Sequence, residues 1–596
     1  MTDSALATTL RTHLCGALRD RDVGSTVRLG GWVHRARDLG GLVFFDLRDR
    51  AGLVQVSIDL ASASPELAQA ARALGAETVV LVEGTVTKRP EAMRNAELGT
   101  GGVEVRAASL RILGPADTPV IPVARGKGEQ LAAEELRLRH RYLDLRRDEL
   151  QQNLVLRHRL MQTTRRFLSE GGFFEIETPM LTKPTPEGAR DYLVPSRVHP
   201  GEFYALPQSP QIYKQLLMIA GYDRYFQIAR CFRDEDLRAD RQPEFTQIDV
   251  EASFVGEEDI MRVAEGLTRA LWLEGGGGEV PVSIRRMPYA DAMERYGIDR
   301  PDLRYGLEIQ DVGEVFRETE FVVTRKALEA GGRVRGIRVP GGAALSRKQV
   351  DELEALAKGA GAFGLLRIKH VNGALDGPAA KFLAEGSAGR LGLAEGDLGL
   401  YVAGPDRISS PALDRVRQEV AHRMQLVPSD VNAFVWVTDF PMFERDPATG
   451  ALAAVHHPFT APNPADLELL DTEPWKARAL AYDLVLNGTE LGGGSIRIND
   501  PRVQSRIFRL LGIDEATAQA RFGFLLEALR AGAPPHGGIA FGFDRIVMVL
   551  AGATSLRDVI AFPKTTAARA LFEGAPSRVP AADIADLHIR VDMEPA

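Results

Sequence analysis

The stretch from Tyr225 to Phe254 constrains the fold of this chain more than any other part of the sequence. Two runs of alternating apolar residues, 225–232 and 245–254, flank a loop of dense charge. Alternation with a period of two around a polar loop predicts an antiparallel hairpin. The strand ends carry Arg233, Glu235, Gln247, Asp249 and Glu251. Because unpaired buried charge is costly, we expect a polyanionic ligand and a counter-charged metal ion to lie against this hairpin.

A solvated surface hairpin is the alternative interpretation of such a charge run. The order Phe-Arg-Asp-Glu at 232–235, followed by Pro-Glu-Phe-Thr-Gln-Ile-Asp at 243–249, favours the ligand site. These residues resemble motif 2 of the class II aminoacyl-tRNA synthetases, the hairpin that holds ATP and the aminoacyl adenylate. The resemblance implies an ATP-binding set on this hairpin, made of Arg233, Glu235, Arg241, Phe245 and Gln247, in which Arg233 also contacts the amino acid.

Composition bounds the class of protein. The chain has 596 residues, 45% hydrophobic and 26% charged, which is ordinary for a globular protein with several domains. Its net charge of −8 excludes nucleic-acid coating by charge alone, so that RNA contacts need local patches and DNA is not expected as a partner. Two cysteines exclude a disulfide framework and suit a reducing cytoplasm. A membrane span and a signal peptide are not expected either.

Residues 1–113 predict a small β domain. Strands are expected over 27–33, 42–48, 53–58, 79–86 and 103–110, with a helical patch over 65–74. Three strands, a helix and two strands fit a five-stranded OB barrel, whose second and third strands commonly bind oligonucleotides. On that face we place Arg35, Arg37, Phe44 and Gln55, because single-stranded RNA requires a stacking plane, phosphate contacts and base-edge hydrogen bonds. Phe44 as a core residue is the alternative.

The run Gly-Trp-Val-His-Arg-Ala-Arg-Asp-Leu-Gly-Gly-Leu-Val-Phe at 31–44 resembles the anticodon-binding domain of aspartyl-tRNA synthetases. The resemblance implies an anticodon set of Arg35, Arg37, Phe44, Gln55, Arg89 and Glu104. Bacterial members that charge both tRNA(Asp) and tRNA(Asn) tend to carry His at the position of Leu39 and Gly near Ala92. Leu39 favours the strict type, and Ala92 does not decide between them.

A Pro-rich hinge is predicted over 114–131, and a helix over about 150–170 leads through Gly171-Gly172 into a short strand that ends at Pro179. This layout resembles class II motif 1, which forms the dimer interface in that family, so a homodimer is expected. The loop 182–191 resembles the mobile loop that closes on aspartate, with Glu187 near the ammonium group. The segment 204–215 places Ser209 and Gln211 before a helix and Lys214 in its first turn, which favours an anion.

In the family the counterpart of Lys214 faces the carboxylate of the substrate side chain, and asparaginyl relatives carry an acidic residue there, so Lys214 indicates aspartate. Arg497 offers the planar fork that grips a carboxylate. His456 and His457 lack a third ligand at zinc spacing, and the resemblance places them in the aspartate pocket. The aspartate-binding set is therefore Glu187, Ser209, Gln211, Lys214, Arg233, Gln247, His456, His457 and Arg497.

The segment 481–497 carries two carboxylates, Asp483 and Glu490, beside Gly492 to Gly494. By resemblance these carboxylates bind the Mg²⁺ that bridges the phosphates of ATP, since hard oxygen ligands suit that ion. The run 537–545 before an apolar helix at 546–550 resembles motif 3 and places Arg545 at the γ-phosphate and the adenine. Arg233 and Arg545 are the predicted catalytic residues. Weak strands and helices over 303–428, among them strands at 321–323, 334–339 and 364–368 and a helix at 348–358, indicate an inserted α+β domain.

The chain is thus identified as a member of the bacterial-type aspartyl-tRNA synthetases, with a multidomain α+β fold. Its expected parts are the OB barrel at 1–113, the hinge at 114–131, an antiparallel catalytic sheet flanked by helices at 132–302 and 429–596, and the insert at 303–428. The resemblance implies a cytoplasmic ligase whose substrates are ATP, L-aspartate and tRNA(Asp). Three alternatives stay open: an enzyme that also charges tRNA(Asn), an amide synthetase paralogue that activates aspartate, and a non-catalytic RNA-binding paralogue.

Overall fold

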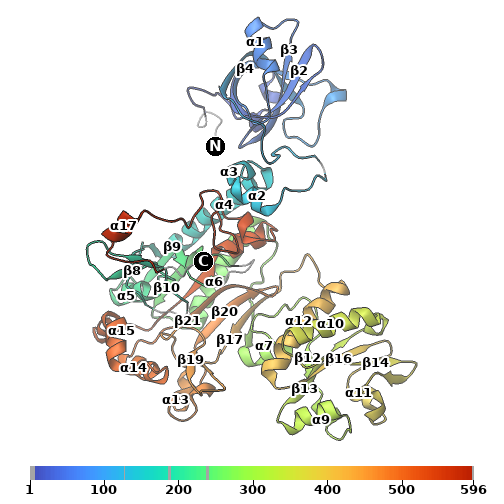
Figure 1. Cartoon of the computed structure of the whole chain (residues 1–596), viewed down its shortest axis with the longest axis vertical. Coiled ribbons are helices and arrows are strands. Elements are labelled where there is room, and N and C mark those ends of the chain that lie inside the picture. The colour runs from blue at the N-terminus through green and yellow to red at the C-terminus, as the bar shows by residue number, and fades with distance from the viewer. Residues whose placement is uncertain (1–6, 127, 186–188, 236–240, 593–596) are drawn as a thin grey trace. The chain divides into compact units, whose positions relative to one another are not determined.

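The computed structural model describes residues 7–126, 128–185, 189–235 and 241–592 (Figure 1). The chain divides into two compact units. The first comprises Met1–His158, Leu237–Gln242 and Ala553–Val579, and the second comprises Arg159–Asp236, Pro243–Gly552 and Pro580–Ala596. Across the described ranges, every helix is too short or too polar to cross a membrane.

The first unit contains a closed five-stranded barrel of strand order β1-β2-β3-β5-β4, with one helix after the third strand. Its elements are β1 Thr26–Asp38, β2 Leu42–Asp49, β3 Gly52–Asp59, α1 Pro65–Arg72, β4 Val79–Lys88 and β5 Val103–Gly114. Alternate residues point inward, so Val27, Leu29 and Val33 enter the core while the residues between them face outward. The predicted OB barrel is confirmed.

Short helices follow the hinge in the same unit: α2 Glu134–Arg139, α3 Arg141–Asp144 and the first part of α4 Asp148–Glu170. The carboxylate of Asp144 is fully buried and pairs with Arg137, Arg141 and Arg147 at 3.3, 2.8 and 2.6 Å. Three cations around one carboxylate offset its desolvation and fix this turn of the chain.

The second unit is built on an eight-stranded sheet of order β11-β17-β20-β21-β22-β10-β9-β6. Its strands are β6 Phe174–Glu175, β9 Arg224–Phe232, β10 Glu244–Ser253, β11 Arg285–Pro288, β17 Phe434–Thr438, β20 Ala481–Leu486, β21 Thr489–Ile496 and β22 His536–Gly542. The central pairs are antiparallel, and the two edge pairs, β11 with β17 and β6 with β9, are parallel. The predicted hairpin corresponds to β9 and β10.

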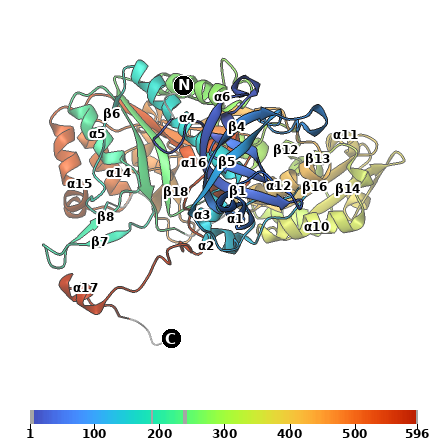
Figure 2. The ribbon, with the colours of Figure 1, turned by 90° about the horizontal axis from the view of Figure 1, so that it is seen from above.

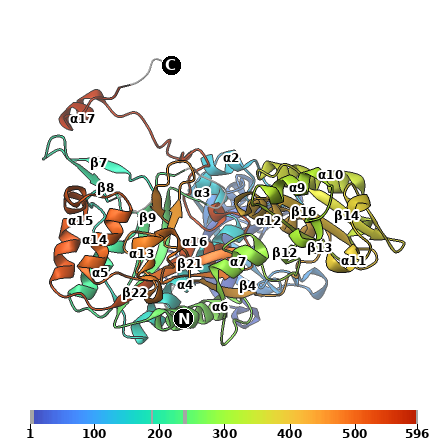
Figure 3. The ribbon, with the colours of Figure 1, turned by 90° about the horizontal axis from the view of Figure 1, so that it is seen from below.

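Helices flank this sheet (Figures 1 and 3). They are α5 Gln211–Ile219, α6 Glu257–Gly275, α7 Tyr289–Tyr296, α13 Leu469–Thr472, α14 Pro501–Leu510, α15 Glu515–Arg530 and α16 Phe543–Leu550. An apolar cluster that includes Ile212, Phe459, Phe508 and Phe522 joins α5, α14 and α15, which lie side by side in Figure 3. Two small hairpins and a terminal helix complete the unit: β7 Leu193–Pro195 with β8 Phe203–Ala205, β18 Phe443–Arg445 with β19 Leu452–Ala454, and α17 Ala581–Asp586.

A separate five-stranded sheet of order β12-β13-β16-β14-β15 lies within residues 303–428 and carries α10 and α12 (Figure 2). Its elements are β12 Ile309–Asp311, α8 Gly313–Phe316, α9 Val322–Glu329, β13 Arg333–Val339, α10 Arg347–Gly359, β14 Leu366–Val371, β15 Ala374–Asp376, α11 Ser387–Arg390, β16 Leu398–Gly404 and α12 Asp406–Arg423. The strand predicted at 321–323 is wrong, because Val322 begins α9. The two β-branched residues suggested a strand, but such residues favour strands when their side chains pack on a buried face. Val322 and Val323 are 48% and 58% exposed and lack that packing.

Candidate active site

The polar residues of β10 lie on one face of the large sheet. Gln247, Asp249 and Glu251 alternate along the strand, opposite Ala229, Gln227 and Tyr225 of β9. Opposite Glu251 on its other side stands Gly538 of β22, where a Cβ atom would lie 2.1 Å from Glu251 Oε2. The glycine run of motif 3 therefore makes room for a buried carboxylate.

Asp249 and Glu251 have cationic partners within the chain. Lys214 Nζ lies 2.6 Å from Asp249 Oδ1 and 3.4 Å from Glu251 Oε2. Arg497 donates two hydrogen bonds to Glu251, at 2.9 and 3.0 Å. All four side chains are buried. Lys214 and Arg497 therefore offset the cost of burying Asp249 and Glu251. The prediction that a bound polyanion and a metal ion offset this cost is wrong for these two carboxylates.

The two carboxylates differ in basicity. Burial raises the pKa of Asp249 above its usual value, and Lys214 opposes this only in part. Burial also acts to raise the pKa of Glu251, but the charges of Arg497 and Lys214 outweigh it and lower the pKa. Glu251 thus stays ionised and ties the two cations to the sheet.

His457 joins this network. Arg497 Nη1 lies 2.7 Å from His457 Nε2, and the Phe459 backbone amide lies 3.2 Å from His457 Nδ1. Burial, and then the charge of Arg497, lower the pKa of His457 well below its usual value and that of His456 to about 4. Both histidines are therefore neutral near pH 7 and line the pocket as polar, uncharged groups.

Three buried polar atoms of this pocket have no hydrogen-bond partner among the described residues. They are Nε2 of Gln211, at the start of α5, Oδ2 of Asp249 and Nε2 of His456. Gln211 and Lys214 are three residues apart and share one helix face. The hydroxyl of Ser209 accepts a hydrogen bond from the backbone N–H of Gln211 at 3.3 Å. The Gln211 donor and the Asp249 acceptor left over in a buried pocket fit a ligand that carries both kinds of group.

A second group of residues lies where β10, β21 and α16 meet. The Arg233 guanidinium stands 5.2 Å from the ring centre of Phe245. Arg545 donates to the backbone oxygen of Glu490, and its Nη1 lies 4.0 Å from Glu490 Oε2. Asp544 accepts a hydrogen bond from the Thr246 amide at 2.8 Å, which fixes the start of α16 against β10. Motifs 2 and 3 are thus joined beside Arg545.

The carboxylates of Asp483 and Glu490 face one another across β20 and β21. Asp483 is opposite Gly493, where a Cβ atom would lie 2.4 Å from Asp483 Oδ1 and 3.7 Å from Glu490 Oε1. A register shift between Leu484 and Val485 pairs Val485 with Glu490, and this bulge turns Glu490 to the face of Asp483. Burial, and then the charge of Glu490, raise the pKa of Asp483 well above its usual value. Two close carboxylates that repel one another fit a divalent cation with open positions.

The remaining predicted residues of this site are distributed as follows. Gln247 accepts a hydrogen bond from the Cys231 thiol at 3.2 Å. Glu235 and Arg241 lie at the two ends of the hairpin loop. Glu187 lies outside the described residues. Asp249, Glu251 and Asp544 were not predicted as site residues, although the alternation along 245–251 marks the first two as lying on the face of Gln247.

The predicted RNA residues share the outer face of the barrel. Phe45 is 1% exposed and enters the core, so Phe44 faces outward, next to Arg37 of β1. Arg35, Asp46, Gln55 and Glu104 form one row across four strands. Gln55 donates a hydrogen bond to Glu104 at 2.7 Å. Burial raises the pKa of Asp46 against the opposing charges of Arg37, Arg35 and Arg89, which surround it. Leu39 and Ala92 are exposed in flanking turns.

Known proteins resemble the chain over almost its full length. Residues 133–566 match the family of class II tRNA synthetases (D, K and N), and residues 27–113 match the OB-fold nucleic acid binding domain. The chain is 51% identical over 587 residues to the aspartate–tRNA(Asp/Asn) ligase of Caldanaerobacter subterraneus subsp. tengcongensis, covering 98% of each chain. It is 50% identical over 586 residues to the aspartate–tRNA ligase of Bacillus licheniformis, again covering 98% of each.

Among solved structures, the asparaginyl-tRNA synthetase of Pyrococcus horikoshii in complex with asparaginyl-adenylate matches with a TM-score of 0.59 at 19% identity. The match covers 93% of this chain and 98% of that one, and it supports the fold. The two matched domains, the identity near one half over 98% of the chain, and the hairpin with its neighbouring strands agree. The chain belongs to the aspartate–tRNA ligase family of class II tRNA synthetases.

Proposed function

We propose that the chain activates L-aspartate with ATP and transfers the aspartyl group to the 3′ end of tRNA(Asp). The observation that carries this proposal is the buried network of Lys214, Asp249, Glu251 and Arg497. Its relatives include enzymes named for aspartate, tRNA(Asp) and tRNA(Asn), which supports the same substrates here.

Unused donors of this network select the side-chain carboxylate of aspartate. Arg497 has five N–H donors, and hydrogen bonds to Glu251, His457 and Ser495 engage four of them. Lys214 has three donors, and its two carboxylate partners leave one. An aspartate carboxylate accepts from both cations. The amide nitrogen of asparagine would present hydrogens to these donors, and such a mismatch in a desolvated site costs roughly 1–3 kcal/mol or more.

The orphaned polar atoms bind the rest of the amino acid. Asp249 Oδ2 accepts from the ammonium group, together with Glu187, while Gln211, Ser209 and Gln247 orient the substrate. Arg233 holds the α-carboxylate and the α-phosphate together. His456 and His457, being neutral, add polar walls that do not compete for the carboxylate.

Arg233, Arg241 and Arg545 bind the phosphates of ATP, while Phe245 and Arg545 enclose the adenine and Glu235 contacts its edge. Asp483 and Glu490 would hold Mg²⁺, whose charge neutralises the phosphate oxygens. The α-carboxylate of aspartate attacks the α-phosphate and pyrophosphate leaves. The terminal ribose hydroxyl of tRNA then attacks the adenylate. Positioning and charge stabilisation by the arginines supply the catalysis, and the reaction requires no nucleophilic side chain.

The barrel at 1–113 reads the anticodon through Phe44, Gln55, Glu104 and the cluster of Arg35, Arg37 and Arg89. Leu39 favours strict charging of tRNA(Asp). Relatives named as aspartate–tRNA(Asp/Asn) ligases are compatible with the alternative, charging of both tRNA(Asp) and tRNA(Asn). The catalytic domain comprises 132–302 and 429–596, interrupted by the insert 303–428. Exposed apolar residues on α4 and β6, such as Val155 and Phe174, support a homodimer through motif 1.

Aspartate-dependent exchange of pyrophosphate into ATP tests the activation step. We expect exchange with L-aspartate to exceed exchange with L-asparagine by at least roughly 5- to 150-fold, since a mismatch of about 1–3 kcal/mol or more corresponds to such a ratio. Comparable exchange with both amino acids would refute the assignment of Lys214 and Arg497. Equal rates in EDTA and in Mg²⁺ would refute the metal site.

A further inference from the structure

Glu77 stands at the joint between the barrel and the chain segment that leads into α4. Its side chain is 3% exposed. Arg48 of β2 donates hydrogen bonds to both of its carboxylate oxygens, at 2.9 and 2.7 Å. Arg146, which follows α3, donates to Oε2 at 2.8 Å. One buried carboxylate of the barrel therefore binds one cation of the barrel and one cation from beyond the hinge.

The backbone at Glu77 is also unusual. Its φ angle of 67° lies in the left-handed region, which residues other than glycine seldom adopt. The Glu77 amide donates to the Val33 carbonyl at 2.7 Å, and the Val33 amide donates to the Thr78 carbonyl at 2.9 Å. A strained residue that aims a buried carboxylate at a cation from another segment indicates a role beyond packing.

The joint continues the predicted RNA face of the barrel. Phe44, Asp46 and Arg48 alternate along β2, so all three side chains lie on the same outer face. Arg48 is opposite Trp32 of β1, and the guanidinium of Arg146 lies 5.3 Å from the ring centre of Trp32. Arg146 therefore contacts Trp32, which is opposite Arg48 on the pair of strands that also carries Arg35 and Phe44.

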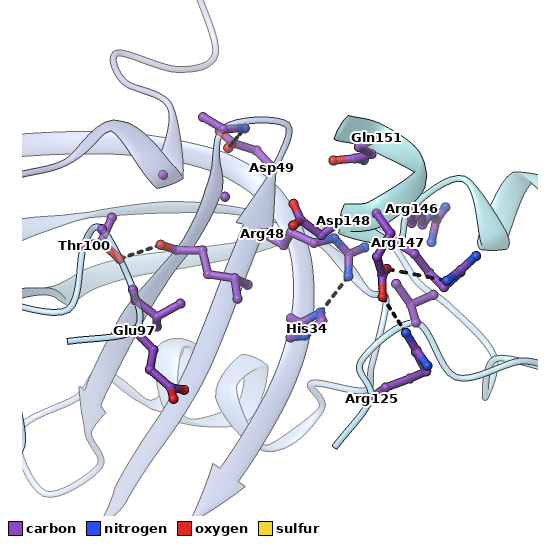
Figure 4. A pocket seen from close by; sticks show the side chains of 18 of the residues that line it. His34, Arg48, Asp49, Glu97, Thr100, Arg125, Arg146, Arg147, Asp148 and Gln151 are labelled. Carbon is purple, nitrogen blue, oxygen red and sulfur yellow. Dashed lines mark hydrogen bonds and ion pairs between the residues drawn. The ribbon is translucent and has the colours of Figure 1, made fainter. Parts of the chain in front are cut away.

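The apolar clusters on the two sides of the Glu77 joint are separate from one another. A cavity of about 670 Å³ lies beside the joint. Figure 4 shows His34 and Arg48 on the barrel side and Arg146, Arg147 and Asp148 on the side of α4. Among the described residues, the apolar core of the barrel and the hinge cluster of Ile121, Val123 and Leu143 are separate clusters. The ion pairs of Glu77 thus join two parts of the described chain whose apolar clusters are separate.

Polar contacts continue from Arg146 within the first unit. Its neighbour Arg147 pairs with Asp144, and Asp144 pairs with Arg141. Arg141 donates to the carbonyls of Ile560 and Ala561, both at 2.9 Å.

Lys564, three residues beyond Ala561, exchanges two backbone hydrogen bonds with the side chain of Gln242, at 2.9 and 3.0 Å. Gln242 follows Arg241, a predicted ATP ligand, at the end of the motif 2 loop. Within the first unit, these polar contacts therefore tie the 141–147 segment to 560–561, and 564 to Gln242 beside Arg241.

We infer that Glu77 is a positioning residue for tRNA charging, which holds the barrel against the 141–147 segment so that an RNA bound by its anticodon delivers its 3′ end to the adenylate. Glu77 touches no substrate. It matters only when one RNA molecule engages both the barrel and the catalytic site. The inference rests on the proposed reading of the anticodon by the barrel.

Three substrates of the full-length enzyme test this inference in E77Q: a full tRNA(Asp) transcript, a minihelix that carries only its acceptor arm, and its anticodon stem-loop. We expect kcat/KM for charging of the full tRNA to fall by roughly 5- to 150-fold, the usual range of a coupling between sites. Charging of the minihelix, pyrophosphate exchange and the Kd of the stem-loop should stay within about twofold, because neither site alone depends on the joint. E83Q, at an exposed position of β4, is the matched control.

R146M removes the other partner of the ion pair and leaves the pair of Glu77 with Arg48 intact. It should therefore reproduce the pattern of E77Q even if E77Q weakens the fold of the barrel. Unchanged charging of the full tRNA in both variants would overturn the inference. If both variants bind the stem-loop more weakly and also have a lower thermal midpoint, the ion pair supports the fold of the barrel. That result would also overturn the inference. A wild-type enzyme that does not bind the stem-loop would instead contradict the proposed anticodon role itself.

Discussion

Replacement of Lys214 by methionine tests the aspartate pocket most sharply. Methionine retains most of the length and the apolar stem of lysine and removes the ammonium group, with its charge and its three donors. Lys214 is 1% exposed and bridges Asp249 and Glu251. The variant therefore loses a donor to the substrate and also the cation that donates a hydrogen bond to Asp249 at 2.6 Å.

The expected magnitude follows from this burial. Loss of one partner of a buried, hydrogen-bonded charge pair costs roughly 2–5 kcal/mol, so kcat/KM for aspartate should fall by about one and a half to three and a half powers of ten. The free energy of unfolding should also fall, by roughly 3–5 kcal/mol. Part of the instability is relieved by acid, because burial already raises the pKa of Asp249. A carboxyl whose pKa is raised in the folded state destabilises it above that pKa, and protonation removes the penalty.

The assay is pyrophosphate exchange over a matrix of aspartate and ATP concentrations, with the thermal midpoint measured at pH 8 and pH 6. The midpoint difference between K214M and wild type should shrink at pH 6. K476M is the control, since Lys476 pairs with Glu473 at the surface. The side chain of Lys476 is 57% exposed and that of Glu473 is 42% exposed. An effect of K214M on the KM for ATP alone, with the KM for aspartate unchanged, would refute our assignment.

Three further predictions concern other parts of the chain. E490Q should lose most pyrophosphate exchange while its thermal midpoint stays near that of wild type, and near-normal exchange would refute the metal site. F44A should lower kcat/KM for tRNA charging by about one to two powers of ten, since stacking on a base is worth roughly 1–3 kcal/mol, while pyrophosphate exchange should hardly change. If both activities fall together with the thermal midpoint, Phe44 is a core residue instead. Burial lowers the pKa of His34 to about 4, so the unfolded chain binds a proton first as pH falls. H34Q should therefore lose less stability than wild type between pH 7 and pH 5; equal losses in thermal melts would contradict this.

The sequence predicted the elements whose local pattern is strong. Alternation along 27–33 marked β1, the polar loop between two apolar runs marked β9 and β10, and the adjacent Phe44 and Phe45 fixed one of the pair in the core. The pattern at 321–323 failed because β-branched residues begin α9 on an exposed face.

Side-chain pairs between residues far apart in the sequence could not be predicted from local patterns. Arg497 and Glu251 are 246 residues apart, and no local pattern joins the cation that follows β21 to a carboxylate of β10. The orientation of Glu490 depends on the bulge between Leu484 and Val485. A strict period of two would have turned Glu490 away from Asp483, and the carboxylates were paired by family resemblance instead.

Transfer of aspartate to RNA is the central claim, and charging of purified tRNA measures it directly. The chain, ATP, Mg²⁺ and labelled L-aspartate are incubated in parallel with transcripts of tRNA(Asp) and tRNA(Asn), and acid-precipitable label is counted. We predict that tRNA(Asp) is charged to a plateau and that tRNA(Asn) is charged far more slowly. Comparable charging of both would contradict the strict specificity drawn from Leu39. Aspartate-dependent pyrophosphate exchange without label on either tRNA would contradict the central claim, and would assign the chain to an enzyme that passes activated aspartate to another acceptor.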